Sequence, residues 1–240
     1  MSNKIALVFG GTRGIGAACV RKLAESGYDV AYTYVTSAPD VPARIGALRT
    51  QGYAANITDA AQVAKVFDAV AKDFGSAPHC VVANAGINVP PGPMAQFNPD
   101  DFRRLVEVNI VGAFNVLQQA ARHVVDGGNI IALTTSMVRV GIPGGGPYTA
   151  TKAAVESLVR SMAKELAGRK VRVNAVAPGP VDTDLFHAGK TDEVKARSAA
   201  LSPFNRIGQP DEVAAVVSFL ASDQASWVHG QVIQPNGGMV

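Results

Sequence analysis

The chain contains the stretch Lys4-Ile-Ala-Leu-Val-Phe9-Gly10-Gly-Thr-Arg-Gly14-Ile-Gly16, in which a short apolar run leads directly into a glycine-rich turn. The apolar run predicts a parallel strand buried on both faces. The residues after the turn favour a helix that ends at Gly27. Glycines at such a turn allow a diphosphate to approach closely, and the helix N-terminus offers unpaired N–H groups and a positive dipole. The stretch therefore predicts a nucleotide site, although the spacing G-x3-G-x-G differs from G-x-G-x-x-G and a merely tight βα turn is the alternative.

Strand-like and helix-like segments alternate along the rest of the chain. Strands are expected at 29–35, 53–56, 80–83, 130–135, 171–177 and 231–234, and helices at 43–51, 59–74, 100–125, 149–166 and 211–220, with Thr58 as an N-cap. This alternation predicts an α/β fold, a doubly wound parallel sheet of the Rossmann type with about seven strands and helices on both faces. We expect a single domain over residues 1–240, with Leu185–Asn205 as a substrate lid.

Composition narrows the classes of protein. The chain has 240 residues, 48% of them apolar, and a net charge of +3 without a Lys/Arg run, so a nucleic-acid partner is not expected. No apolar run approaches the ~18 residues of a membrane span, and no signal-peptide pattern opens the chain. Cys19 and Cys80 lie in distant apolar segments and are expected to be buried thiols. No metal-ligand spacing occurs. We therefore predict a soluble cytoplasmic protein without a metal site.

The segment from Ser136 to Lys152 carries the candidate chemistry. Tyr148 and Lys152 are four residues apart in a helix-compatible sequence, so they share a helix face. An ammonium beside a phenol lowers a pKa that is normally about 10, and a phenol tuned in this way exchanges a proton with a substrate oxygen. Ser136 follows a strand, and the glycines at 141 and 144–146 allow its hydroxyl to fold back toward Tyr148. The alternative is a solvated Tyr–Lys pair.

Two further segments extend this site. Asn84-Ala85-Gly86 follows a predicted strand, and ligands of open parallel sheets bind beyond the carboxyl ends of strands, although an ordinary loop would look the same. Asn109 interrupts an apolar helix face, so it is either a satisfied core side chain or the holder of an active-site water.

The type of cofactor depends on the residues after the second strand. An NAD site places Asp or Glu about 20 residues past the glycines, where it holds the ribose 2′-hydroxyl. Here Val35, Thr36 and Ser37 occupy that region, and Asp40 is the next acid. Arg13, inside the glycine turn, could attract a 2′-phosphate, so NADP(H) is the predicted cofactor.

Taken together, these motifs resemble the short-chain dehydrogenase/reductase family, in its single-domain branch of about 250 residues. The resemblance runs from Lys4 to the C-terminus, and it is closest to proteins similar to 3-oxoacyl-acyl-carrier-protein reductase. The motifs that carry it are Gly10–Gly16, Asn84-Ala-Gly86, Asn109, Ser136, Tyr148-Thr-Ala-Thr-Lys152, Asn174-Ala-Val-Ala-Pro-Gly179 and Arg206-Ile-Gly-Gln-Pro-Asp-Glu212.

The resemblance implies a role for each matching residue. Tyr148 would be the general acid in carbonyl reduction, Lys152 would bind the nicotinamide ribose and depress the pKa of Tyr148, and Ser136 would hold the substrate oxygen. Asn109 would position a water that continues the proton relay from Lys152. The implied cofactor contacts are Gly10, Thr12, Arg13, Gly14, Ile15, Gly16, Thr36, Asn56, Ile57, Asn84, Ala85, Gly86, Tyr148, Lys152, Pro178, Gly179, Val181 and Thr183.

The sequence departs from the family pattern at four positions. Phe9 and Asn56 stand where Thr and Asp are usual, Thr36 where Arg is frequent, and Thr135 is a second hydroxyl, thirteen residues before Tyr148. A shift of one residue would exchange Ser136 for Thr135.

Three functions remain open at this level. They are an NADPH-dependent carbonyl reductase, an NAD-linked alcohol dehydrogenase and an NADP(H)-binding sensor without turnover. A small carbonyl or alcohol substrate is expected, with an apolar pocket drawn from Met94, Met137, Val138, Ile142, Phe186 and Phe204. The apolar helix segments 106–117 and 155–166 also fit the interface of a homo-oligomer, a tetramer or a dimer.

Overall fold

The computed structural model describes residues 3–36, 41–188 and 190–240, and these residues form one sheet with helices on both faces. The sheet has eight strands in the order β3-β4-β2-β1-β5-β6-β7-β8. The strands are β1 (Lys4–Phe9), β2 (Tyr28–Tyr34), β3 (Arg44–Ile45), β4 (Leu48–Ala54), β5 (Cys80–Ala83), β6 (Asn129–Leu133), β7 (Arg172–Val176) and β8 (Val232–Ile233). Only the β3–β4 pair is antiparallel, so the predicted doubly wound α/β fold is confirmed.

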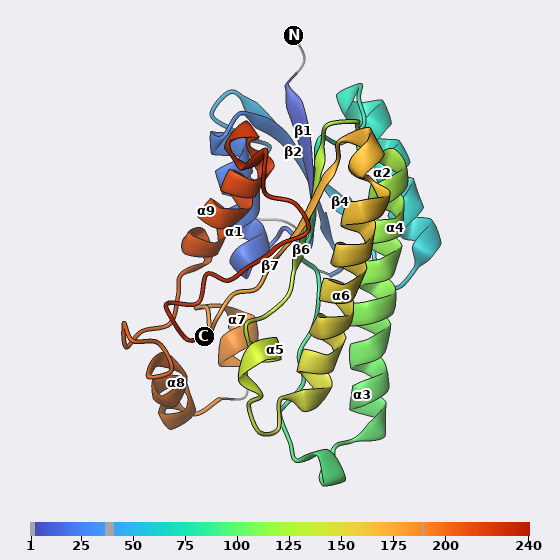
Figure 1. Ribbon diagram of the computed structural model, residues 1–240. Helices are drawn as coiled ribbons and strands as arrows, with labels where there is room; N and C mark the ends of the chain where they lie inside the picture. The colour runs from blue at the N-terminus through green and yellow to red at the C-terminus, as the bar shows by residue number, and fades with distance from the viewer. Residues whose placement is uncertain (1–2, 37–40, 189) are drawn as a thin grey trace.

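Helices cover the sheet on both sides (Figure 1). Helices α1 and α9 pack together on one face, while α2, α4 and α6 cover the other. Each face has its own core cluster of fully buried aliphatic side chains, because strands covered on both sides bury every residue. The helices are α1 (Gly14–Glu25), α2 (Ala60–Phe74), α3 (Pro99–Val106), α4 (Ala113–His123), α5 (Met137–Val140), α6 (Gly146–Glu165), α7 (Asp184–His187), α8 (Asp192–Ala199) and α9 (Pro210–Ala221).

The strand order reverses beside β1. This strand pairs with β2 on one side and β5 on the other, so the chain winds outward in opposite directions from this point. The loops that leave the carboxyl ends of β1 and β5 therefore diverge and open a crevice, which is where doubly wound sheets bind their ligands. In Figure 1 the short helices α5, α7 and α8 lie at this end of the sheet.

One predicted element is wrong. The expected helix at 43–51 is a short hairpin of β3 and β4, in which Ile45 lies opposite Leu48. Gly46 has φ +58°, a left-handed conformation that a two-residue hairpin turn requires and that an α-helix cannot contain. The third predicted strand, 53–56, is thus the end of a longer strand, β4, and the sheet has eight strands rather than about seven.

Three other expectations change in detail. The predicted helix at 100–125 contains a π-helical turn, η2 (Glu107–Gly112), between α3 and α4. Asp59, rather than Thr58, caps α2 by accepting from the N–H groups of Ala61 and Gln62. The predicted lid, Leu185–Asn205, contains α8 and all of α7 except its first residue. Ser37 and Asp40, which entered the argument about the cofactor, lie outside the described residues.

Candidate functional site

The glycine turn after β1 is compact for steric reasons. Gly10 has φ +77°, and its N–H donates to the Thr33 hydroxyl at 3.0 Å. A Cβ on Gly16 would lie 1.9 Å from the carbonyl oxygen of Gly10, so only glycine fits there. Thr33, which the sequence analysis did not single out, thus supports the turn from β2. Its only signal in the sequence is a hydroxyl within a buried strand.

The N-terminus of α1 leads out of this turn and fits an anionic group. Arg13 is the N-cap residue, is exposed, and its side chain provides no capping hydrogen bond. The first N–H groups of a helix have no intrahelical partner, and the dipole adds positive charge at this end. The turn therefore offers the cradle, unshielded by side chains, that the diphosphate of a dinucleotide requires. Thr12, Gly14 and Ile15 line the same turn and are partly exposed.

The loop after β5 locks against the glycine turn. The Asn84 amide donates to the carbonyls of Phe9, at 3.3 Å, and Gly10, at 2.9 Å. Ala85 also contacts the turn, since a Cβ on Gly10 would lie 3.0 Å from its Cα. The two segments are thus joined although Phe9 has no hydroxyl, because the backbone carbonyl of Phe9 accepts the hydrogen bond.

Gly86, in the loop after β5, lies against two of the candidate catalytic residues, Asn109 and Lys152. A Cβ at this position would lie 3.1 Å from Oδ1 of Asn109 and 3.3 Å from Nζ of Lys152. Helix α6 supplies Lys152, and the turn η2 supplies Asn109. Residues from three separate parts of the chain thus meet at the end of β5.

Lys152 is buried and anchored to the sheet. Its side chain crosses from α6 to β6, where Nζ donates to the carbonyl of Leu133 at 3.0 Å. Burial lowers the pKa of Lys152 to about 8. Tyr148 is one helical turn earlier and half-buried, and desolvation of its phenol raises the pKa to about 12. The predicted lowering of the Tyr148 pKa by Lys152 is therefore not what this structure shows, because desolvation of the phenol is the dominant effect.

The side chain of Asn109 is fully paired within the protein. Its oxygen accepts from the Ile87 N–H at 2.9 Å, and its amide donates to the Ile87 carbonyl at 2.9 Å and to Thr151 Oγ1 at 3.2 Å. Thr151 in turn donates to the carbonyl of Tyr148 at 2.7 Å. Of the two alternatives, the geometry favours a satisfied core amide, and it makes Asn109 a link between the β5 loop and the helix that carries Tyr148.

The hydroxyl of Ser136 is engaged within the fold. Its side chain is fully buried, its hydroxyl donates to the carbonyl of Ala177 at 2.7 Å, and its oxygen accepts from the Asn236 amide at 3.1 Å. The single proton of Ser136 is therefore used within the fold. The neighbouring Thr135 accepts from the Met137 N–H at 3.3 Å, and its own proton has no acceptor among the described residues.

The loop after β7 closes the crevice from the other side. Thr183 caps α7, and a Cβ on Gly14 would lie 3.0 Å from its methyl group, so this loop touches the glycine turn. The Pro178 carbonyl accepts from the Ser136 N–H at 2.9 Å, and the Gly179 N–H donates to the Pro235 carbonyl at 3.1 Å. Val181, which is buried, bridges to Gly208.

The predicted adenine contacts lie around the end of β4 and β2. Asn56 is exposed, and its side chain accepts from the Thr58 N–H at 3.1 Å. Ile57 is buried, with its carbonyl bonded to the Asn115 amide at 2.9 Å. Thr36 is exposed just beyond β2. These residues follow strands on the same side of the switch point, where the far end of an extended dinucleotide would lie.

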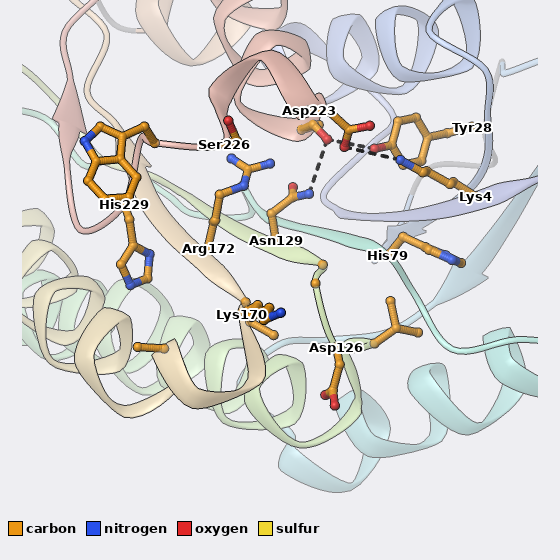
Figure 2. A pocket seen from close by; sticks show the side chains of 17 residues that line it. Lys4, Tyr28, His79, Asp126, Asn129, Lys170, Arg172, Asp223, Ser226 and His229 are labelled. Carbon is orange, nitrogen blue, oxygen red and sulfur yellow. Dashed lines mark hydrogen bonds and ion pairs between the residues drawn. The ribbon is translucent and has the colours of Figure 1, made fainter.

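A hollow of about 940 Å³ lies at the opposite end of the sheet (Figure 2). Its polar side chains are largely engaged with one another or with the backbone. Lys4 pairs with Asp223 at 3.5 Å, the Tyr28 hydroxyl donates to the Ala221 carbonyl at 2.8 Å, and Arg172 donates to carbonyls at the end of α9. These contacts join the end of α9 to the sheet. The polar side chains around the hollow therefore have structural roles, and they are separate from the crevice at the other end of the sheet.

The described residues contain neither a cluster of metal-ligating side chains nor a membrane-spanning helix. Within residues 3–36, 41–188 and 190–240, no three His, Cys, Asp or Glu side chains gather as metal ligands would. Among the helices of the part that the structure describes, none has the length and apolar character needed to span a bilayer.

A doubly wound sheet with a glycine cradle at its switch point, and with a buried lysine and a half-buried tyrosine one turn apart on an adjoining helix, is the architecture of a nicotinamide-dependent oxidoreductase domain. The family model described as enoyl-(acyl carrier protein) reductase matches residues 10–240. The chain is 38% identical to 3-oxoacyl-[acyl-carrier-protein] reductase FabG of Staphylococcus aureus, over 98% of each chain. It is 39% identical to an NADPH-dependent aldehyde reductase-like protein, chloroplastic, of Arabidopsis thaliana, over 100% of this chain and 95% of the relative.

Solved structures of short-chain dehydrogenases have the same fold as this chain. A short-chain dehydrogenase from Burkholderia cenocepacia, in complex with NADP, superposes with a TM-score of 0.89 and 33% identity over 98% of this chain and 97% of the other. The chain belongs to the short-chain dehydrogenase/reductase family, as the sequence motifs indicated.

The pKa of Lys152 gives a test of its burial. Because the folded pKa is about 8 and the ordinary value is 10.5, the unfolded chain binds a proton more readily between these values. The contribution of Lys152 to stability is therefore lost as pH falls through about 8 and is fully present above 10.5. We expect the free energy of unfolding of wild type, measured relative to Lys152→Met in urea, to rise between these pH values. If the difference in free energy of unfolding between wild type and Lys152→Met did not change with pH, the burial of the Lys152 ammonium would be contradicted.

Proposed function

We propose that the protein is an NADP(H)-dependent carbonyl reductase, with Tyr148 as the general acid. The observation that carries the proposal is the buried Lys152 ammonium beside Gly86 in the loop that locks against the glycine turn, with the half-buried Tyr148 one helical turn away on α6. A phenol with a pKa of about 12 stays protonated at neutral pH, so it is ready to give a proton and poorly suited to remove one. A protonated phenol is the form that reduction of a ketone or 3-oxoacyl carbonyl requires.

The bound cofactor would supply the hydride, and the protein would bind, orient and protonate. Tyr148 would donate its proton to the carbonyl oxygen as negative charge develops there. Lys152, held by the Leu133 carbonyl, would place a positive charge one helical turn from the phenol and stabilise the phenolate that results. Asn109 would hold the Ile87 segment and α6 in register, and the relay through a water at Asn109 stays a prediction.

For the second hydroxyl, the contacts support Thr135 over Ser136. A group that holds a substrate oxygen must donate a proton to it, and the Ser136 proton is already donated to Ala177. Thr135 stands at the end of β6, one residue past Thr134, and keeps its proton available. We therefore propose that Thr135 and Tyr148 grip the carbonyl oxygen, while Ser136 supports the strand end.

The cofactor is proposed to be NADP(H). Arg13 is exposed at the N-terminus of α1, and no described acid follows β2 where an NAD site would need one. The Arabidopsis relative is named as NADPH-dependent, and the Burkholderia structure contains NADP. The cofactor would be held by the glycine cradle, by the Asn84–Gly86 loop and by Pro178, Gly179, Val181 and Thr183 at the nicotinamide end.

The substrate is proposed to be an apolar carbonyl compound. Met94 and Phe204 are among the most exposed large apolar side chains, at 72% and 69%, and the Met94 methyl approaches Gly146 at the start of α6. Segment 185–205 is the proposed lid. We also propose a homo-oligomer, since Phe102 and Phe114 leave apolar surface exposed along α3 and α4. A cytoplasmic location stays a prediction.

The decisive experiment compares wild type with Tyr148→Phe on a panel of ketones and aldehydes with NADPH. Loss of the phenolic proton should lower kcat by about 100-fold or more, while NADPH binding, measured by fluorescence titration, stays close to wild type. Full activity in the variant would refute Tyr148 as the acid. Tight NADPH binding by wild type without turnover on any substrate would favour a sensor instead.

Thr135→Val and Ser136→Ala separate the two hydroxyls. Because Thr135 is proposed to touch the substrate, its variant should lower kcat/KM for the carbonyl by about 100-fold, a loss comparable to that of one oxyanion donor. Ser136 acts only through position, so its variant should cost about tenfold. The reverse order would restore Ser136 to the role first predicted for it.

Arg13→Ala tests the choice of cofactor. The guanidinium would form a charge-assisted hydrogen bond to a 2′-phosphate and none to a 2′-hydroxyl. We expect the Kd for NADPH to rise by about tenfold, with little change for NADH, in parallel titrations. Equal weakening of both, or a wild-type preference for NADH, would support an NAD-linked alcohol dehydrogenase.

A further inference from the structure

The C-terminal turn Asn236–Gly238 reaches back to the end of β6. The Asn236 amide donates to the Ser136 hydroxyl at 3.1 Å, although the two residues are 100 positions apart in the chain. The Asn236 oxygen accepts from the N–H groups of Gly238, at 3.0 Å, and Met239, at 3.2 Å. One side chain therefore closes its own turn and bonds to the residue next to Thr135.

The same turn packs against the loop after β7, which contains Pro178 and Gly179. A Cβ on Gly179 would lie 3.0 Å from Cα of Asn236, so the two backbones are in direct contact. The Gly179 N–H donates to the Pro235 carbonyl. Ser136 bonds to the two residues before Gly179: its N–H donates to the Pro178 carbonyl, and its hydroxyl donates to the Ala177 carbonyl. Asn236 thus lies where the end of β6 and the loop after β7 must be kept in register.

The proposed lid anchors the turn from outside. Ser202, which is 6% exposed, donates its hydroxyl to the Gly237 carbonyl at 2.7 Å and accepts from the Phe204 N–H at 3.1 Å. A Cβ on Gly237, which has φ +65°, would lie 2.5 Å from the Ser202 oxygen. In Figure 1 the C-terminus lies at the carboxyl end of the sheet, the end at which α5 and α7 also lie.

We propose that Asn236 is a positioning residue for carbonyl reduction, acting through Ser136 on the placement of Thr135. The inference rests on the proposed function, because it assigns Asn236 to the same site. Asn236 does not touch the substrate in this scheme. It fixes the rotation of the Ser136 hydroxyl and, with it, the backbone from which Thr135 presents its own hydroxyl. Small displacements of a reacting group have large effects on rate, and an error of 1 Å costs up to about 100-fold.

The test compares Asn236→Ala with Asn236→Asp in the full chain, with NADPH and the best carbonyl substrate. The alanine variant should lower kcat by about tenfold while the Kd for NADPH stays within about twofold of wild type. Aspartate still accepts from Gly238 and Met239, so it keeps the turn, but it cannot donate to the Ser136 hydroxyl and should be about as slow as the alanine variant. An aspartate variant with the kcat of wild type would overturn the assignment of the Ser136 contact, because the turn alone would then explain the alanine result.

Asn174→Ala is the matched control. Asn174 is also a paired amide close to the C-terminal segment, donating to the Val228 carbonyl at 2.8 Å and accepting from the Gln231 N–H at 3.0 Å, with no contact to Ser136. It should lower the thermal midpoint without slowing kcat at a temperature where the protein is folded. Equal slowing by both variants would reduce Asn236 to a purely structural residue.

A double-mutant cycle with Ser136→Ala completes the test. If Asn236 acts through Ser136, the double variant should be no slower than either single variant. Multiplied losses would overturn the inference. Absence of turnover by the unchanged chain would overturn the proposed function and the inference together, whereas normal turnover by Asn236→Ala would overturn the inference alone.

Discussion

The buried ammonium of Lys152, held by the Leu133 carbonyl, is the contact on which the rest of the site depends. A charge inside a protein is costly unless it is hydrogen-bonded, and this bond ties α6 to the carboxyl end of β6. Because Tyr148 is on the same helix, the bond also fixes where the phenol lies. The core on that face of the sheet therefore holds the catalytic helix in place.

The site is assembled from loops that follow β1, β5, β6 and β7, none of which could form it alone. Asn84 clamps the glycine turn, Asn109 clamps the Ile87 segment, and Asn236 reaches the end of β6. Each of the three is an amide, which can donate and accept at once and so can join two strands of backbone without introducing a charge. Rigid loops at the end of a rigid sheet are what a preorganised active site requires.

Much of this arrangement was predictable from the sequence. The apolar run Lys4–Phe9, the glycine turn and the Tyr148–Lys152 spacing indicated the fold and the position of the site, because each depends on local periodicity. The hairpin at Arg44–Leu48 was missed because a single left-handed glycine outweighed a helix-compatible composition. Thr33 and Asn236 were missed because their partners are distant in sequence. The choice between Thr135 and Ser136 depends on which hydroxyl the fold has already used, and neighbouring hydroxyls look alike in a sequence.

The π-helical turn at Glu107–Gly112 has a consequence for how this family member can vary in length. Such a turn accommodates one residue more than the regular helical repeat would hold, and here that bulge carries Asn109. Removing that residue would restore regular winding and leave α3 and α4 nearly in register, because the wide turn absorbs the extra residue instead of rotating α4 by the about 100° that one residue of a regular helix turns. The apolar stripe of α4 would still face the sheet, but the bulge that presents Asn109 would be lost. A one-residue deletion here should consequently be tolerated by the fold and not by the site.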